Sequence, residues 1–102
     1  MKAHLNSYVV IVTFEVKMAY RGVFREAILE NASASRGSEP GCTVFDVWEN
    51  QDGSEIFLYE VYNSEAAFKE HLSTEHFRRF ETVVAPWIID RHVTTYHRLM
   101  QD

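Results

Sequence analysis

The spacing of apolar residues changes several times along the chain, and each change predicts a different element. Residues 7–16, SYVVIVTFEV, are dense in β-branched and aromatic side chains, and both alternating faces are apolar until Glu15. These features predict a strand that is buried on two sides. Apolar residues at spacings of three and four then predict an amphipathic helix over residues 19–34. The RGSEPG segment that follows contains two glycines and a proline, which predict a loop.

The middle of the chain predicts a β-hairpin. Residues 42–50, CTVFDVWEN, have the composition of a second strand, and residues 56–63, IFLYEVYN, that of a third. Between them, Asp52-Gly53 tolerates the positive φ that a tight turn demands. The two strands are therefore expected to pair antiparallel.

The remaining segments predict two short helices and a last strand. Ser64 can cap a helix over residues 64–72, and Ser73 or Thr74 can cap another that ends around Pro86. Residues 91–100, RHVTTYHRLM, close the chain as a fourth strand.

The resulting order is β-α-β-β-α-β, with the second helical position divided into two short helices. This order predicts an α+β, ferredoxin-like antiparallel sheet, in a single domain over residues 1–102. Helices cover only one face of such a sheet, yet three of the strands carry apolar residues on both faces. We therefore expect a homodimer in which a second copy packs sheet to sheet.

Charge and composition narrow the classes of partner. The net charge of -5 lacks the basic surface that phosphate backbones require, so we expect no nucleic-acid partner. The longest apolar run, residues 8–12, is too short to span a membrane, and no secretion signal is evident. A soluble, cytoplasmic protein is expected. The single cysteine, Cys42, cannot form an internal disulfide and is interpreted as a small buried residue at a strand start.

Four sequence elements together resemble the antibiotic biosynthesis monooxygenase (ABM) superfamily, which includes small quinol monooxygenases and the autoinducer-2-processing protein. The resemblance covers about residues 5–98. Its elements are Asn31 and Ser35 late in the first helix, the EPGC turn at 39–42, Tyr59-Glu60 on the third strand, and AFKEHLSTEHF with His71 and His76.

The resemblance implies a dimeric α+β barrel, a pocket between the sheet and the helices of each subunit, and oxygenation without a flavin, metal or other cofactor. The sequence departs from the family pattern at two positions. Tyr62 stands where many relatives have Trp, and Glu75 stands where a Pro is common. The aromatic role that relatives give to that Trp is therefore not transferred to this chain.

A metal site is the first hypothesis that His71 and His76 raise. On a continuous helix, positions five apart point about 140° away from one another, whereas paired ligands usually lie three or four apart. No Cys, Asp or Glu completes an evident ligand set in the sequence, and His92 and His97 would face opposite sides of a strand. We therefore expect no metal ion here.

General acid–base chemistry suits His71 better. His71 follows Phe68 by three positions, so its ring shares the face that turns toward the sheet, where a polar group needs a partner. If its face of the third strand is the helix side, Glu60 could be that partner and hold one tautomer, which would make His71 a base for a phenol or enol proton. His76, next to Phe77, either contacts a substrate or caps and packs at the pocket entrance.

Several further residues are candidates for contact with a substrate. Asn31 and Ser35 share one helical face. The Asn31 amide could hold a carbonyl or oxyanion of a substrate, or it could cap the end of the helix. Ser35 is interpreted as a structural residue, with contact to a substrate as the alternative. Among the aromatic residues, Phe45 and Trp48 lie on opposite faces of one strand, and Tyr59 lies on the next. Each either lines the pocket or belongs to the core.

The resemblance, together with these candidates, implies a cofactor-independent monooxygenase that oxidises a small quinol- or anthrone-like aromatic with O2, with His71, Asn31 and Glu60 as its catalytic residues. One alternative is an isomerase of a small ketose or phosphoketose, related to autoinducer-2 processing, with the same acid–base residues. A second is a non-catalytic dimeric module that binds a small apolar molecule. A weaker one is haem degradation, with His71 or His76 as the axial ligand.

Overall fold

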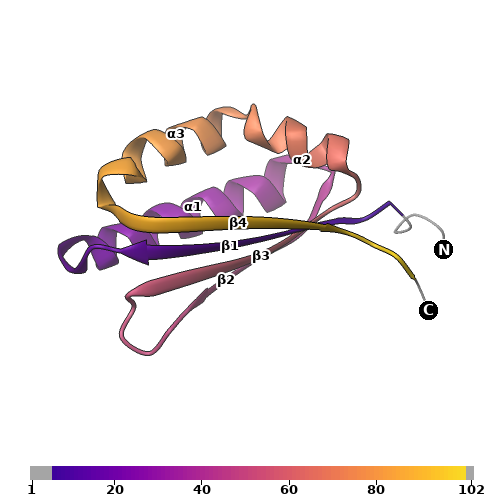
Figure 1. Ribbon diagram of the computed structural model, residues 1–102. Coiled ribbons are helices and arrows are strands. Elements are labelled where there is room, and N and C mark those ends of the chain that lie inside the picture. Colours follow the sequence, from indigo (N-terminus) through magenta and orange to yellow (C-terminus); the bar gives the residue numbers. More distant parts are fainter. Residues whose placement is uncertain (1–5, 101–102) are drawn as a thin grey trace.

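A computed structural model describes residues 6–100 as a four-stranded antiparallel sheet with three helices on one face (Figure 1). The strands are β1 (Tyr8–Val16), β2 (Cys42–Glu49), β3 (Glu55–Tyr62) and β4 (Ile88–His97), in the spatial order β2-β3-β1-β4. The helices are α1 (Arg21–Ser38), α2 (Glu65–Leu72) and α3 (Glu75–Val84), with short 3-10 turns η1 (Met18–Tyr20) and η2 (Ala85–Trp87). The predicted ferredoxin-like fold is confirmed. The two ends of the domain predicted over residues 1–102 lie outside the described residues.

Strand alternation separates a core face from an outer face. On β1, the side chains of Val10, Val12 and Phe14 are buried beneath the helices. Their antiparallel partners on β3 are Glu60, Leu58 and Ile56, which are buried on the same face. This register directs the carboxylate of Glu60 into the core, beside apolar side chains.

Helix α1 runs four residues further than the pattern predicted and ends at Ser38. Glu39 takes an extended conformation, with φ −106° and ψ 105°, because a residue before proline is disfavoured in the helical region. Gly37 does not end the helix: an added side chain there would meet nothing, so the position is simply open to solvent. The longer helix carries Glu39 toward α2.

Helices α2 and α3 are separated by a break between Leu72 and Glu75, and each helix begins at a capping side chain. The Ser64 hydroxyl accepts a hydrogen bond from the backbone N–H of Ala67, and the Thr74 hydroxyl accepts one from Phe77. Thr74 is thus the second cap, one of the two predicted alternatives. Because the chain turns at this break, the rings of His71 and His76 lie with their centres 6.0 Å apart.

Gly41 allows the turn after α1 to approach α2 closely. A Cβ at Gly41 would lie 2.6 Å from the Cβ of Ala67, which is closer than the Cβ atom of one residue comes to a non-bonded atom of another in proteins. The turn is also tied to the end of β3, because the Gly41 carbonyl accepts a hydrogen bond of 2.8 Å from Asn63. This packing holds Glu39 against α2. Gly53, with φ 77°, forms the predicted turn between β2 and β3.

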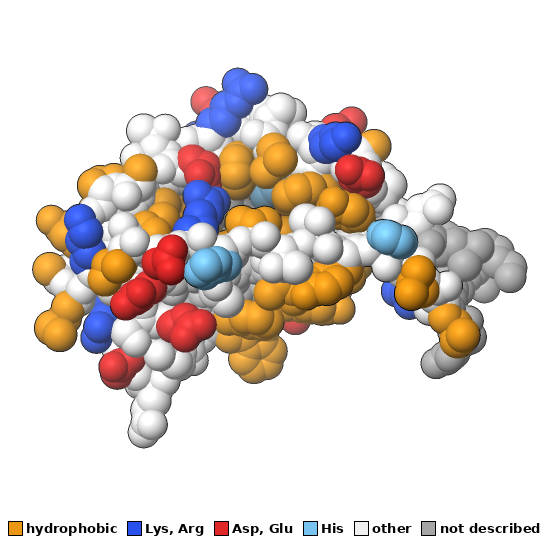
Figure 2. Space-filling model, viewed as in Figure 1, with side chains coloured by type: hydrophobic (Ala, Val, Ile, Leu, Met, Phe, Trp, Pro, Cys, Tyr) orange, Lys and Arg blue, Asp and Glu red, His pale blue; other side chains and the backbone are white. Residues whose placement is uncertain are grey.

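The sheet face away from the helices carries large apolar side chains. Trp48 is 60% exposed and Tyr96 54% exposed there, and Phe57 and Tyr59 are each more than a third exposed. Figure 2 shows hydrophobic side chains gathered on the side of the sheet opposite the helices. None of the helices in residues 6–100 has the length and apolar character that crossing a membrane would require.

Candidate functional site

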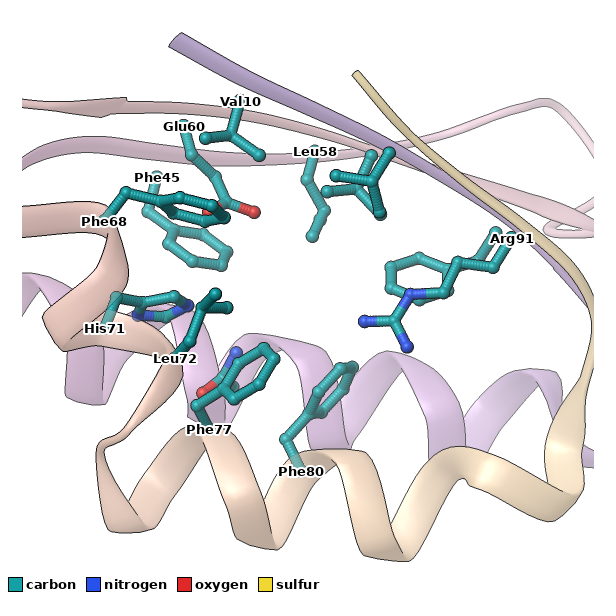
Figure 3. A pocket seen from close by; sticks show the side chains of 14 residues that line it. Val10, Phe45, Leu58, Glu60, Phe68, His71, Leu72, Phe77, Phe80 and Arg91 are labelled. Atoms are coloured by element: carbon teal, nitrogen blue, oxygen red, sulfur yellow. The ribbon is translucent and has the colours of Figure 1, made fainter. Parts of the chain in front are cut away.

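A cavity of about 280 Å³ lies between the sheet and the helices. Its wall is apolar except for four residues, and Figure 3 shows several of these side chains around the central space. The polar residues are Asn31, Glu60, His71 and Arg91. Phenylalanine rings from four elements supply much of the remaining wall, at positions 14, 45, 68, 77 and 80. Such a cavity suits a small, flat, apolar ligand that a few polar groups orient.

His71 is the buried histidine of this wall. Its side chain is 3% exposed, and its Nδ1 lies 2.9 Å and 3.1 Å from the two carboxylate oxygens of Glu39. A carboxylate accepts hydrogen bonds, so this contact places the ring proton on Nδ1. Within residues 6–100 no group hydrogen-bonds to Nε2, which is therefore available as a base. Burial lowers the pKa of His71, and the Glu39 carboxylate opposes that shift.

His76 binds the same carboxylate from the other side of the helix break. Its Nε2 forms a short hydrogen bond with Oε2 of Glu39, and its side chain is 17% exposed. His76 does not line the main cavity; it borders a smaller cleft between α1 and α3, together with Asn31. Glu39 belongs to the EPGC turn, but its contact with His71 has no signal in the sequence because the two residues are 32 positions apart.

Glu60 faces the cavity, which the sequence had left open, but it does not hold His71. Its Oε1 instead accepts a hydrogen bond of 2.6 Å from the Tyr62 hydroxyl. The prediction that Glu60 orients the His71 ring is therefore wrong, and Glu39 occupies that role. Burial raises the pKa of Glu60 to about 7, despite the hydrogen bond from Tyr62 that opposes the shift. Glu60 is thus a second titratable group on the cavity wall.

Asn31 and Ser35 are both buried on the face of α1 that packs onto the core. Asn31 lines the cavity, and its Oδ1 has no hydrogen-bond partner among residues 6–100. A buried amide without a partner is costly unless a ligand or water satisfies it. Ser35 is fully buried, lies outside the cavity wall, and also lacks a partner for its hydroxyl within the described part of the chain. Asn31 is therefore the one of the pair that can contact a ligand.

Arg91 also lines the cavity, although it was not among the residues predicted from the sequence. Its Nη1 donates a hydrogen bond of 2.7 Å to Glu81, its Nη2 binds the other oxygen of the same carboxylate, and its guanidinium lies 5.1 Å from the centre of the Phe14 ring. Figure 3 shows Arg91 at the opposite end of the cavity from His71. In the sequence, Arg91 is a charged residue directly after Asp90, and nothing indicates that it faces inward. In the structure, Arg91 pairs with Phe14 in the β1–β4 register, and this pairing places it on the core face.

The aromatic candidates separate by strand face. Phe45 is buried and lines the cavity, and its ring centre is 6.1 Å from that of His71. Trp48 and Tyr59 project from the outer face of the sheet and do not line the cavity. Cys42 is buried at the start of β2, as expected, and burial raises the pKa of its thiol to about 11.

Comparison with known proteins places this fold and cavity in a family. Residues 7–83 match the model of the antibiotic biosynthesis monooxygenase family. The chain is 32% identical over 75 residues to Rv0793 of Mycobacterium tuberculosis, described as a putative monooxygenase; the match spans 74% of this chain and 73% of that protein.

Solved structures agree with this assignment. A putative antibiotic biosynthesis monooxygenase from Nitrosomonas europaea superposes with a TM-score of 0.86 at 31% identity, over 92% of this chain and 91% of the other. The structure of Rv0793 superposes with a TM-score of 0.85 at 27% identity, over 93% of this chain and 97% of the other. The chain belongs to the antibiotic biosynthesis monooxygenase family, which confirms the resemblance seen in the sequence.

Proposed function

We propose that this protein is a cofactor-independent monooxygenase that oxidises a small quinol-like aromatic with O2. The observation that carries the proposal is the His71 imidazole, which Glu39 holds by Nδ1 while its ring borders the apolar cavity. A neutral imidazole fixed in one tautomer is suited to accept a phenolic proton at neutral pH. Membership of a family of monooxygenases supports the same reading.

The dimensions and chemistry of the cavity support a small aromatic substrate. Its volume of about 280 Å³ exceeds that of a cavity that holds benzene, roughly 150 Å³. One or two fused rings therefore fit, and the phenylalanine walls offer edge and face contacts to them. Asn31 lines the cavity, and its Nδ2–H group would donate a hydrogen bond to a ring oxygen as that oxygen becomes an anion, whereas the unpartnered Oδ1 can only accept.

The reaction balances with the substrate as the only reductant. Nε2 of His71 accepts the phenolic proton, and the resulting electron-rich anion passes an electron to O2. Recombination forms a carbon–oxygen bond on the ring, and cleavage of the O–O bond of the peroxide releases one oxygen atom as water. A hydroquinone and O2 thus give a hydroxyquinone and water. His71 returns its proton to the departing oxygen.

Among the alternatives, the ketose isomerase finds less support in the cavity. A phosphorylated ketose needs a cation for its phosphate, and Arg91, the cationic residue of this wall, is already paired with Glu81. An isomerase that only moves protons needs no O2, so it would turn over its substrate under anaerobic conditions. A purely ligand-binding module would bind quinols without consuming oxygen.

Oxygen uptake with a panel of one- and two-ring quinols tests the proposal. We expect uptake that depends on both protein and quinol, and that falls at least about a hundredfold in His71→Ala. His92→Ala serves as the matched control, since His92 is an exposed histidine on β4. Absence of uptake with every quinol, or equal rates in the two variants, would reject the proposal.

We further propose that the protein is a homodimer formed through the outer face of the sheet, where Trp48, Tyr59 and Tyr96 are exposed. Exposed aromatic residues on one sheet face are the composition that protein interfaces favour. Sedimentation of the wild-type protein should give a dimer, and Trp48→Asp a monomer. Leu29→Asp is the control, because Leu29 is similarly exposed but lies on α1. A wild-type monomer would contradict this arrangement.

A further inference from the structure

We propose that Glu39, His71 and His76 form a binding site for a divalent transition-metal ion such as zinc. One ligand atom from each residue lies within 4.8 Å of the other two. Nδ1 of His71 and Nε2 of His76 both already contact Oε2 of Glu39. The three side chains therefore converge on one point, which the five-residue spacing of the two histidines had argued against.

The donor set matches the chemistry of zinc. Two imidazole nitrogens and one carboxylate oxygen are ligands that zinc accepts, with a fourth position left for water or another group. Zinc–ligand bonds of about 2.0–2.2 Å place tetrahedral ligand atoms roughly 3.3 Å apart. The separation of 2.9 Å between Nδ1 of His71 and Oε2 of Glu39 is slightly smaller, so small side-chain rotations would open the site.

The surroundings give the site rigidity and partial shelter from water. The side chains of Glu39, His71 and His76 are 10%, 3% and 17% exposed, respectively. Glu39 follows α1, His71 lies at the end of α2 and His76 at the start of α3, so one ion would join three helices. The close packing of Gly41 on Ala67 already holds the first two of these elements together.

A second consequence rests on the proposed function. An ion bound to Nδ1 of His71 leaves the ring proton on Nε2, the nitrogen that would otherwise accept the substrate proton. A zinc-loaded site would therefore inhibit quinol oxidation. Zinc binding itself does not depend on that activity, so the two proposals can fail separately.

Isothermal titration of the metal-free full-length chain with zinc chloride, in the absence of any quinol, tests the site. We expect one zinc per chain, with affinity at least about tenfold lower in Glu39→Gln and in His76→Ala. His92→Ala should bind zinc like the wild type. His92 and Asp90 form an exposed pair, and neither belongs to the cluster of three potential ligands found among residues 6–100. Zinc should also raise the melting temperature of the wild type, since a ligand of the native state stabilises it.

Circular dichroism first establishes that each variant is folded. If Glu39→Gln does not fold, His76→Ala and His76→Gln decide the question, because His76 is the most exposed of the three ligands. The proposal is overturned if the wild type shows no saturable zinc binding, or if His92→Ala loses as much affinity as His76→Ala. If zinc binds as expected but no quinol supports oxygen uptake, the metal site stands and the proposed function does not.

Discussion

Nδ1 of His71 and Oε2 of Glu39 lie 2.9 Å apart, although 32 positions separate the two residues in the chain. The contact joins the turn after α1 to the last turn of α2. Because both oxygens of Glu39 face the same ring nitrogen, the carboxylate fixes which nitrogen of His71 carries the proton. The proposed base is therefore positioned by a residue outside the cavity wall.

Replacing Glu39 with Gln should lower the kcat of quinol oxidation by roughly 10²–10⁴-fold, because an amide no longer imposes the tautomer that leaves Nε2 free. The assay includes a chelator, so that metal bound to the same residues does not contribute. Glu70→Gln, an exposed change on α2, is the control and should retain full activity. A mutant that loses only substrate affinity would show that Glu39 is not a positioning residue.

Asn31→Leu should separate activity from stability. We expect kcat to fall by roughly 10²–10³-fold, as with the loss of an oxyanion donor. The free energy of unfolding should rise by about 1 kcal/mol, since Oδ1 of Asn31 is buried without a partner in the described chain. Ser35→Ala, one turn along the same face of α1, removes another unpartnered buried group and should leave activity unchanged. Equal loss of activity in both variants would argue for a packing effect.

Glu60 should make the protein less stable as pH rises. Its pKa is about 7 in the folded state and about 4.5 in the unfolded chain, so the folded state holds more protons between these values. Stability from this group is present below pH 4.5 and is lost as pH rises through 7. Urea unfolding should find Glu60→Gln more stable than wild type by roughly 1–3 kcal/mol at pH 8. The difference should shrink toward pH 5, and a difference independent of pH would contradict the burial of a titrating carboxyl.

Gly41→Ala tests the packing that brings the turn against α2. The added methyl group would overlap the Cβ of Ala67, and we expect a loss of about 1–3 kcal/mol in the free energy of unfolding. Gly22→Ala is the control, because no atom lies near the added methyl group. Gly22 lies in α1, where alanine favours the helix more than glycine does, so the free energy of unfolding should rise by up to ~1 kcal/mol. Both values come from urea titrations, and a neutral Gly41→Ala would mean that the turn does not depend on this contact.

The fold was readily predictable, because the periods of apolar residues distinguish strands from helices and Ser64, Thr74 and Gly53 supply local signals. The candidate site was predictable only in part. Alternation placed Phe45 and Trp48 on opposite faces of one strand, but only the packing of the helices determines which face encloses a cavity. The Glu39–His71 contact depends on a turn and a helix break whose relative position no local pattern encodes.

Incorporation of isotopically heavy oxygen shows whether His71 initiates oxygenation of a bound quinol. Single turnover under labelled O2, analysed by mass spectrometry, should give a product with one heavy oxygen atom bound to the ring. His71→Ala should give only the slow, protein-independent background. Product without the label, or the same label and rate from His71→Ala, would show that His71 does not initiate an oxygenation.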